Sequence, residues 1–171
     1  DDEKDEGDLY TVDVKNGQPS EPKLYDDDVH TYAGTRFAGD HIIYYKNYKD
    51  GKADLYIDGS EADFDASTGT SYNKDNDKIF FYVDYDSEKS QGTLRVYSNG
   101  KTETIANDVH TYRVLSGEEI VYISDFSQKS YKGDLYLYRK GKAAKIDEDV
   151  VALTLGGTNR TYQGGLNYYG W

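Results

Sequence analysis

The segment GDLYLYRKGKAAKID, residues 133–147, contains the pattern that decides the fold. Leucine and tyrosine alternate over residues 135–138, which suits a half-buried strand whose successive side chains point to opposite faces. Lys140-Gly141 follows where a two-residue hairpin turn is expected, because both central positions of that turn favour positive φ. The segment therefore predicts two antiparallel strands joined by a tight turn.

The same hairpin signal recurs along the chain at a nearly constant spacing. The turn glycines Gly17, Gly59, Gly100 and Gly141 are separated by 42, 41 and 41 residues. Two further sets of positions repeat every 40 or 41 residues: Leu24, Phe64, Ile105 and Ile146, and Tyr32, Tyr72, Tyr112 and Leu153. No segment shows helical spacing, so the period of about 41 residues indicates tandem β units.

Each unit is expected to contain four short strands. In the best-defined unit these lie at Tyr112, at residues 120–123, at residues 134–138 and at a segment ending near Ile146. Four antiparallel strands in about 40 residues, repeated without helices, are typical of a propeller blade. The predicted fold class is therefore all-β, a β-propeller of four-stranded antiparallel blades.

The number of units predicts a single propeller domain, residues 1–171, with four blades. The expected blades are 28–67, 68–107, 108–148, and a split blade made of 149–171 plus 1–27. In the split blade the terminal segments pair and close the ring, which leaves no exposed strand edge. A closed monomer is favoured. The alternatives are a fragment of a larger ring and a half-ring completed by a second copy.

On these residues the chain resembles bacterial, mostly Gram-positive, β-propeller repeat proteins. Their blades carry a Gly-Asp-Leu-Tyr-Leu-Tyr strand, a Gly-Lys hairpin and a terminal Ile-Asp-x-Asp-Val, which match residues 133–138, 141–142 and 146–150. The resemblance covers essentially the whole chain and implies an extracellular or cell-envelope location. It implies no catalytic residue, because blade families share shape more than activity.

Charge and composition exclude several classes of function. The chain has 32 acidic and 20 basic residues, a net charge of −12, and no cysteine. Its charge repels phosphate backbones, so nucleic acid is not an expected partner. The absence of cysteine excludes disulfides, zinc-thiolate sites and cysteine nucleophiles. A mean hydropathy of −0.88 predicts no membrane insertion.

Two of the three histidines occupy the same place in the repeat, because the sequence DVHTY occurs at residues 28–32 and again at 108–112. In a four-bladed ring the first and third blades face each other, which would bring both histidines to the central channel. The candidate ligands for a divalent cation there are His30, His110, Asp28 and Asp108. The favoured interpretation is that duplication copied a histidine used for packing or hydrogen bonding, so no cofactor is expected, and the channel cation is the alternative.

Two acidic loops, residues 84–88 and 125–127, are a weaker candidate for cation binding. Alternating carboxylates can supply the oxygen ligands that calcium prefers. No stretch matches the twelve-residue calcium loop, with its glycine at the sixth and glutamate at the twelfth position. Solvated loops are therefore the simpler interpretation.

Tyrosine is the most informative side chain for recognition, since the chain has 19 of them. Aromatic faces stack on sugar rings or anchor protein partners. Most are expected to fill the interfaces between blades, as for Tyr32, Tyr72, Tyr112 and Tyr136. Four fall in expected loops and are candidate binding residues: Tyr48, Tyr85, Tyr131 and Tyr162.

Enzyme motifs are absent from the sequence. There is no Gly-x-Ser-x-Gly, no glycine-rich phosphate loop and no His-Glu-x-x-His. We therefore expect a non-enzymatic binding or scaffold module, without catalytic residues, that recognises a protein or peptide on the loop face of the propeller. A carbohydrate-binding, lectin-like propeller is the alternative.

Overall fold

The protein is built from β-strands. The computed structural model describes residues 5–73, 75, 77–116 and 119–153. Of these residues 74% lie in strands and none lies in a helix, and the strands form antiparallel sheets that are not closed. In this part of the chain there is accordingly no helix long and apolar enough to cross a membrane. The all-β prediction is confirmed.

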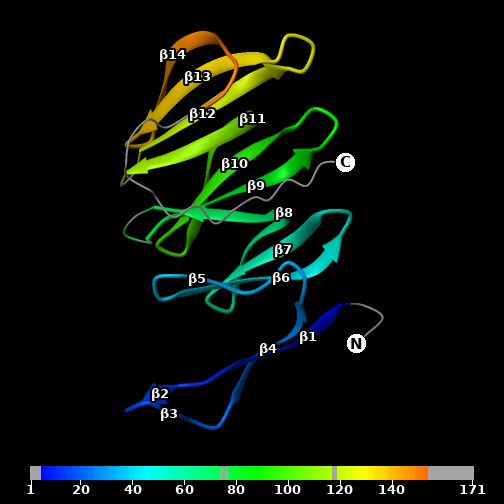
Figure 1. The fold of residues 1–171 in the computed structure, drawn as a ribbon, viewed down its shortest axis with the longest axis vertical. Helices are drawn as coiled ribbons and strands as arrows, with labels where there is room; N and C mark the ends of the chain where they lie inside the picture. Colours follow the sequence, from blue (N-terminus) through cyan, green and yellow to red (C-terminus); the bar gives the residue numbers. More distant parts are fainter. Residues whose placement is uncertain (1–4, 74, 76, 117–118, 154–171) are drawn as a thin grey trace. The chain divides into compact units, whose positions relative to one another are not determined.

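The chain divides into two compact units, with the boundary between Thr68 and Gly69, and each is described by itself. The strands that begin in the first unit are β1 (Glu6–Thr11), β2 (Val14–Lys15), β3 (Gln18–Pro19), β4 (Lys23–His30), β5 (Arg36–Ala38), β6 (His41–Lys49), β7 (Lys52–Ile57) and β8 (Ser60–Tyr72). β1 pairs with β4, β2 pairs with β3, and β5 to β8 pair in chain order (Figure 1).

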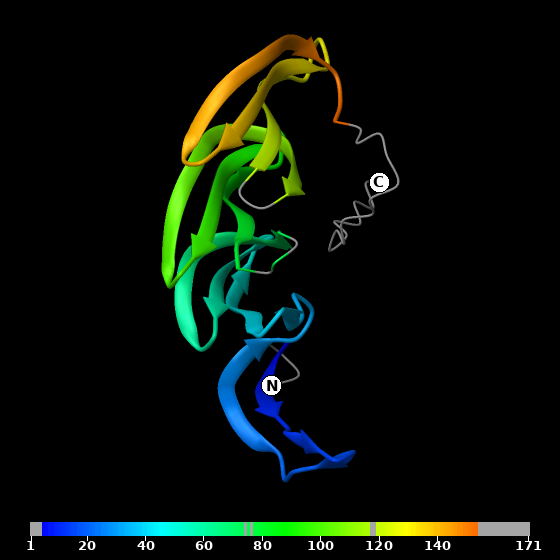
Figure 2. The same cartoon turned by 90° about the vertical axis from the view of Figure 1, so that its left-hand side faces the viewer.

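The second unit begins within β8 and forms a meander of hairpins. Its further strands are β9 (Ile79–Asp86), β10 (Gln91–Ser98), β11 (Lys101–Ser116), β12 (Glu119–Ser127), β13 (Lys132–Arg139) and β14 (Lys142–Val150). From β9 to β14 each strand pairs with the next along the chain. Figure 2 shows the marked curvature of the β13–β14 hairpin, drawn in orange.

Four two-residue turns form where the sequence predicted hairpins. At Asn99-Gly100 the central φ angles are 52° and 74°, and Ser98 pairs with Lys101 across the turn. Positive φ at both central residues matches the right-handed twist of the flanking strands and favours Asn followed by Gly. The same conformation occurs at Asn16-Gly17, Asp58-Gly59 and Lys140-Gly141. The hairpin prediction is confirmed at all four turns.

The strand pairs β1–β4, β7–β8, β10–β11 and β13–β14 share one irregularity. In β10–β11, Gly92 pairs with Val109. The next pair is Leu94 with Ala106, so two residue steps on β10 face three on β11. The extra residue is accommodated in a β-bulge at Asp108, whose φ is 51°. The equivalent positive-φ residues are Asp28, Asp65 and Asp149.

The bulges correct the sequence alignment of the repeats at two positions. Ile105 is the extra residue of a second bulge in β11. That place is held by Ala62, not Phe64, in β8 and by Tyr25, not Leu24, in β4. The misalignment arises because the number of residues between the turn glycine and the bulge aspartate differs from repeat to repeat. The turn glycine and the bulge aspartate are Gly59 and Asp65 in β8, but Gly100 and Asp108 in β11. A constant period therefore aligns the turns correctly and misaligns the strand that follows.

Consecutive repeats are joined without a loop in the second unit. β11 pairs with β10 over residues 101–109 and with β12 over residues 109–116. The sequence predicted two short strands here, one ending a repeat and one beginning the next, but they form a single strand of 16 residues. The bulge at Asp108 explains the difference, because a bulge bends and twists a strand and lets it change partners.

The core of the second unit lies where two repeats meet. Its buried side chains come from β9 to β12: Phe80, Tyr82, Leu94, Val96, Val109, Tyr112, Val114, Ile120 and Tyr122. Tyr136 packs against this cluster, so Tyr112 and Tyr136 fill the interface as expected. Tyr72 is half-buried, whereas Tyr32 is 81% exposed. The expectation for Tyr32 is wrong because the residue lies in the turn after β4, where the chain has left the sheet.

Candidate functional site

Two neighbouring loops of the second unit form the first candidate site. We call residues 86–91 and 126–131, between β9 and β10 and between β12 and β13, the linked-loop surface. Gln128 donates from its side-chain amide to the Glu88 carbonyl oxygen at 2.5 Å and to Ser90 Oγ at 3.3 Å. One side chain thus binds the neighbouring loop at two points.

Two further side chains tie the same loops together. Gln91 Nε2 donates to the Phe126 carbonyl oxygen at 2.6 Å, in the direction opposite to the Gln128 bonds. His110 Nδ1 lies 2.8 Å from the Ser90 carbonyl oxygen, which can only accept, so this nitrogen carries the proton. The His110 ring also stacks on Phe126, with 3.7 Å between centroids and 5° between planes. The loops are therefore held in one arrangement.

In three repeats, a residue with a positive φ angle near the end of a strand is followed directly by an aromatic residue. The residues Asn47, Asp84 and Asp125 adopt φ angles of 53°, 51° and 52° in the strand that precedes each loop. The next residues along the chain are Tyr48, Tyr85 and Phe126. Because the register shifts at this point in all three repeats, the bulge turns an aromatic ring out of the strand's alternation.

The four tyrosines proposed for binding differ in their environments. Tyr131 is 67% exposed and lies on the linked-loop surface, and Tyr48 is 43% exposed. Tyr85 instead packs against the core cluster, so its assignment to an exposed loop is wrong. The bulge after Asp84 accounts for this, because it directs the Tyr85 ring against Tyr82, at 5.5 Å between centroids. Tyr162 lies outside the described residues.

The two duplicated histidines are used differently. His30 is buried, and its Nδ1 accepts a hydrogen bond from the Ala33 backbone N–H at 3.0 Å. Its ring lies against Tyr48, with centroids 4.4 Å apart. His110 packs on Phe126, the residue equivalent to Tyr48, but its Nδ1 donates. The repeat thus preserves the aromatic packing of each histidine and exchanges the hydrogen-bonding role of Nδ1.

The proposed channel cation is not tested by this geometry. His30 and His110 belong to different units, and Asp28 and Asp108 are the bulge residues that precede them. Among the residues that the structure describes, no group of three or more histidine, aspartate or glutamate side chains is placed to hold a metal ion. A site made from both units stays a prediction.

The acidic loop of the linked-loop surface uses a carboxylate to hold its own backbone. Asp86 Oδ1 accepts from the backbone N–H of Glu88 at 2.9 Å and of Lys89 at 3.0 Å. The hydrogen bond from the Lys89 backbone lowers the pKa of Asp86, and the Lys89 side chain acts in the same direction. Asp86 is therefore an ionised turn cap that stabilises the loop.

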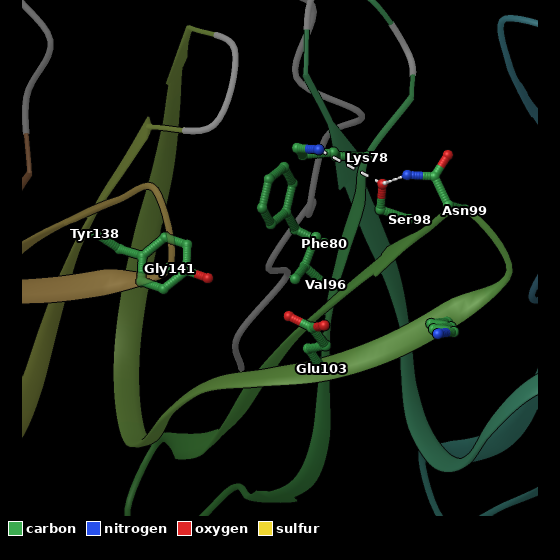
Figure 3. Close-up of a pocket in the computed structure, with 9 residues that line it drawn as sticks. Lys78, Phe80, Val96, Ser98, Asn99, Glu103, Tyr138 and Gly141 are labelled. Carbon is green, nitrogen blue, oxygen red and sulfur yellow. Dashed lines mark hydrogen bonds between the residues drawn. The ribbon is translucent and has the colours of Figure 1, made fainter.

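A pocket of about 450 Å³ lies at the other end of β10 (Figure 3). It is placed between the β10–β11 turn and the β13–β14 turn, so two consecutive repeats line it. Its apolar side comprises Phe80, Val96 and the ring of Tyr138. Its hydrogen-bonding side chains include Lys78, Ser98, Asn99, Lys101 and Glu103. The volume falls within the range of small-ligand sites, about 300–1,000 Å³.

The polar side of the pocket is organised around Ser98. Lys78 Nζ and Asn99 Nδ2 both approach Ser98 Oγ, at 3.5 and 3.3 Å (Figure 3). Lys78 also pairs with Asp77 at 3.8 Å. The lining contains two lysines and one glutamate, whereas the whole chain carries a net charge of −12. Because Asp77 pairs with Lys78, Lys101 is the lining lysine without an ion pair among the described residues.

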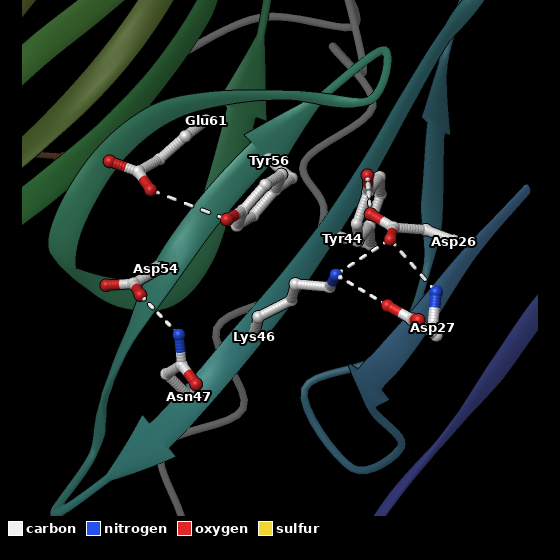
Figure 4. A network of polar contacts seen from close by, with 8 residues as sticks. All are labelled: Asp26, Asp27, Tyr44, Lys46, Asn47, Asp54, Tyr56 and Glu61. Carbon is white, nitrogen blue, oxygen red and sulfur yellow. Dashed lines mark hydrogen bonds and ion pairs between the residues drawn. The ribbon is translucent and has the colours of Figure 1, made fainter.

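A polar cluster joins β4 to β6 in the first unit. We call it the Asp26 network, and it comprises Asp26, Asp27, Tyr44 and Lys46 (Figure 4). Tyr44 Oη donates to Asp26 Oδ2 at 2.5 Å, and Lys46 Nζ donates to Asp26 Oδ1 at 2.7 Å. Lys46 also lies 5.3 Å from the centre of the Tyr56 ring. These bonds pair the ionised groups with one another, which favours a structural role over catalysis.

The charge states of the Asp26 network follow from its hydrogen bonds. Burial tends to raise the pKa of Asp26, but the bonds from Lys46 and Tyr44 outweigh burial and lower it. Burial raises the pKa of Tyr44, and the Asp26 carboxylate raises it further. Burial tends to lower the pKa of Lys46, but the bond to Asp26 raises it above its ordinary value. A carboxylate, an ammonium and a neutral phenol therefore coexist at neutral pH.

Comparison with known proteins gives no relative: no protein-family profile, no curated protein and no solved structure matches the chain. The candidate sites therefore depend on their geometry alone. Sequence reasoning missed both Gln91 and Gln128, because each bonds a residue at least 35 positions away. It also missed the pocket, whose Tyr138 wall and Phe80 floor come from different repeats.

Proposed function

We propose that the protein is a non-enzymatic binding module that recognises a protein or peptide through the linked-loop surface. The observation that carries the proposal is the reciprocal bonding of Gln91 and Gln128, which holds two loops of consecutive repeats together. Pre-ordered loops lose less conformational entropy when a partner binds, which raises affinity.

The chemistry of the surface favours a basic partner. Tyr131 offers an exposed aromatic face that can act as an anchor. Asp86, in the other loop of the same surface, is held ionised, and the chain as a whole carries a charge of −12. Association with a basic protein or peptide should therefore be accelerated by long-range attraction and should slow as salt screens it.

A peptide selection tests this function. Peptides from a random displayed library are selected on the immobilised protein, and their affinities are measured for Tyr131→Ala and for Tyr10→Ala, an exposed tyrosine of the first unit. We expect at least a tenfold loss with Tyr131→Ala and no loss with Tyr10→Ala. Equal affinities for both variants, or an affinity that does not change with salt, would contradict the proposal.

We further infer that the repeats form a four-bladed propeller closed by a split blade. In the described residues β1 pairs only with β4, whereas the equivalent β7, β10 and β13 each have a second neighbour. Residues 149–171 contain the sequence for the missing partner. A fragment of a larger ring and a half-ring completed by a second copy remain the alternatives. A solution mass of 19.4 kDa at all concentrations supports the closed ring, and twice that mass contradicts it.

The family resemblance of the repeats supports an extracellular or cell-envelope location.

In a closed four-bladed ring, His30 and His110 would face a common channel, and Asp28 and Asp108 would lie beside them. Elemental analysis after exchange into metal-free buffer tests for a divalent cation there. Loss of the same ion in both His30→Ala and His110→Ala would support a shared channel ligand. The expected result is that no such ion is lost, which leaves only the packing role.

A further inference from the structure

We infer that the pocket between the β10–β11 and β13–β14 turns binds a small acidic carbohydrate of the uronate class. This site lies at the opposite end of β10 from the linked-loop surface, so the inference is independent of peptide recognition. It follows from three features of the lining: its hydrogen-bonding groups, its aromatic wall and its charge (Figure 3).

The hydrogen-bonding groups favour a ligand with many hydroxyls. The lysine amines donate, the Glu103 carboxylate accepts, and Ser98 and Asn99 do both. An apolar ligand would remove water from these groups without replacing their hydrogen bonds, which is costly. Sugar hydroxyls both donate and accept, so a single pyranose ring can satisfy donors and acceptors placed around it.

The aromatic wall supplies a surface for the sugar ring. Phe80 is almost completely buried and forms the floor, whereas Tyr138 is only half-buried and presents its ring to the pocket from the neighbouring repeat. The C–H face of a pyranose packs on such a ring, because an aromatic face buries apolar area while polar groups remain at its edge. Tyr138 is thus the expected stacking platform.

The charge of the lining selects an acidic sugar. Lys78 is paired with Asp77 at 3.8 Å, so Lys101, which has no ion pair among the residues that the structure describes, is the lining cation available to a ligand. Lys142 holds the place of Lys101 in the next repeat, directly after the equivalent turn, yet it does not line the pocket. A carboxylate on the ligand would form a charge-assisted hydrogen bond with an ammonium group, about twice as strong as a neutral one.

Titration of the full chain with sodium D-galacturonate, monitored by amide NMR and calorimetry, tests the inference. We expect saturable shifts confined to the β10–β11 and β13–β14 turns, and at least fivefold weaker binding of D-galactose. Lys101→Gln should weaken galacturonate binding at least fivefold, and Tyr138→Ala should abolish it. Lys142→Gln is the matched control and should leave binding unchanged.

Several results would overturn the inference. These are equal binding of galactose and galacturonate, equal effects of Lys101→Gln and Lys142→Gln, or no saturable shift with galacturonate or its linear trimer. Tighter binding of a short acidic peptide at the same turns would assign the pocket to a protein partner instead. Because Lys101 is exposed, its substitution tests binding without loss of fold. These outcomes concern the pocket alone. Recognition of peptides at the linked-loop surface is tested separately, by the effect of Tyr131→Ala on the affinity of the selected peptides.

Discussion

The Asp26 network and the β11–β12 junction are the same place in two repeats, built from different chemistry. The registers of the strands make Asp26, Tyr44 and Lys46 equivalent to Ala106, Tyr122 and Ser124. In the first unit the junction is an ion pair with a hydrogen-bonded phenol. In the second unit Ala106 packs against the apolar cluster that contains Tyr122.

The difference teaches that the bulged backbone, not the chemistry of the contact, is the constant element of the repeat. Either chemistry joins one repeat to the next strand. The two are not equal in robustness, however. In an apolar junction, the loss of stability grows with the buried volume that a substitution removes. In an ionic junction, a substitution that removes one partner leaves the other charge partly buried and without its counter-charge. Substitutions at the two junctions should therefore differ in size and in additivity.

The largest effect is expected from Leu94→Ala in the apolar junction. Leu94 is fully buried in the core of the second unit. Its truncation should lower the free energy of unfolding by about 2–5 kcal/mol, through lost burial and a residual cavity. Urea denaturation followed by tyrosine fluorescence measures the change. Leu24→Ala, at an exposed position, is the control and should cost less than about 0.5 kcal/mol.

Asp26→Ala should destabilise the polar junction by about 2 kcal/mol, because it leaves the Tyr44 hydroxyl without its acceptor and leaves Lys46 with only the longer contact to Asp27, at 3.5 Å. Adding Lys46→Ser reproduces the residues of the equivalent apolar junction. The double variant should therefore lose less stability than the sum of the two single variants in a urea double-mutant cycle. Strict additivity would show that the network is not a coupled unit.

Tyr112→Phe should cost about 1 kcal/mol, because the phenol donates to the Phe80 carbonyl oxygen within the core. Burial raises the pKa of Tyr112 from 10.0 to about 12. The phenol must stay neutral in the folded state, so its contribution is complete below pH 10 and is lost as the pH rises towards 12. Stability measured across this range should fall less steeply in Tyr112→Phe than in the wild type.

The smallest effect concerns acid. The pKa of Asp26 is lowered in the folded state from its ordinary value of 3.8, so its contribution is present above pH 3.8 and is lost as the pH falls through the folded value. Thermal melting between pH 5 and pH 2 should therefore separate the wild type from the Asp26→Ala/Lys46→Ser variant. An identical decline in both proteins would mean that other carboxylates account for the acid sensitivity.

The sequence predicted those parts of the fold that local backbone preference determines. Asn99-Gly100 identifies a turn because few other pairs accept positive φ twice. The bulges at Asp65 and Asp108 escaped prediction, since aspartate tolerates the left-handed region but does not require it. The junction of β10, β11 and β12 was correspondingly expected as separate strands.

The candidate sites were harder to predict because they depend on contacts between repeats. The pair of DVHTY segments identified His110 as an unusual residue, but only the structure shows its bond to Ser90 and its stacking on Phe126. Tyr85 looks like a loop residue in the sequence, but it is partly buried and packs against the core cluster. Exposure of an aromatic side chain beside a bulge depends on which way the extra residue turns it, and composition does not encode that direction.

The shared strand β11 also bears on how the second unit folds. The first half of β11 completes one hairpin, and its second half pairs with β12 of the next repeat. Each repeat therefore provides the strand edge with which the next repeat pairs. Pairing from β9 to β14 involves only neighbours along the chain, a topology of low contact order that folds fast. Folding can therefore nucleate at any tight turn and propagate in both directions, with a free-energy cost at each repeat set by its junction.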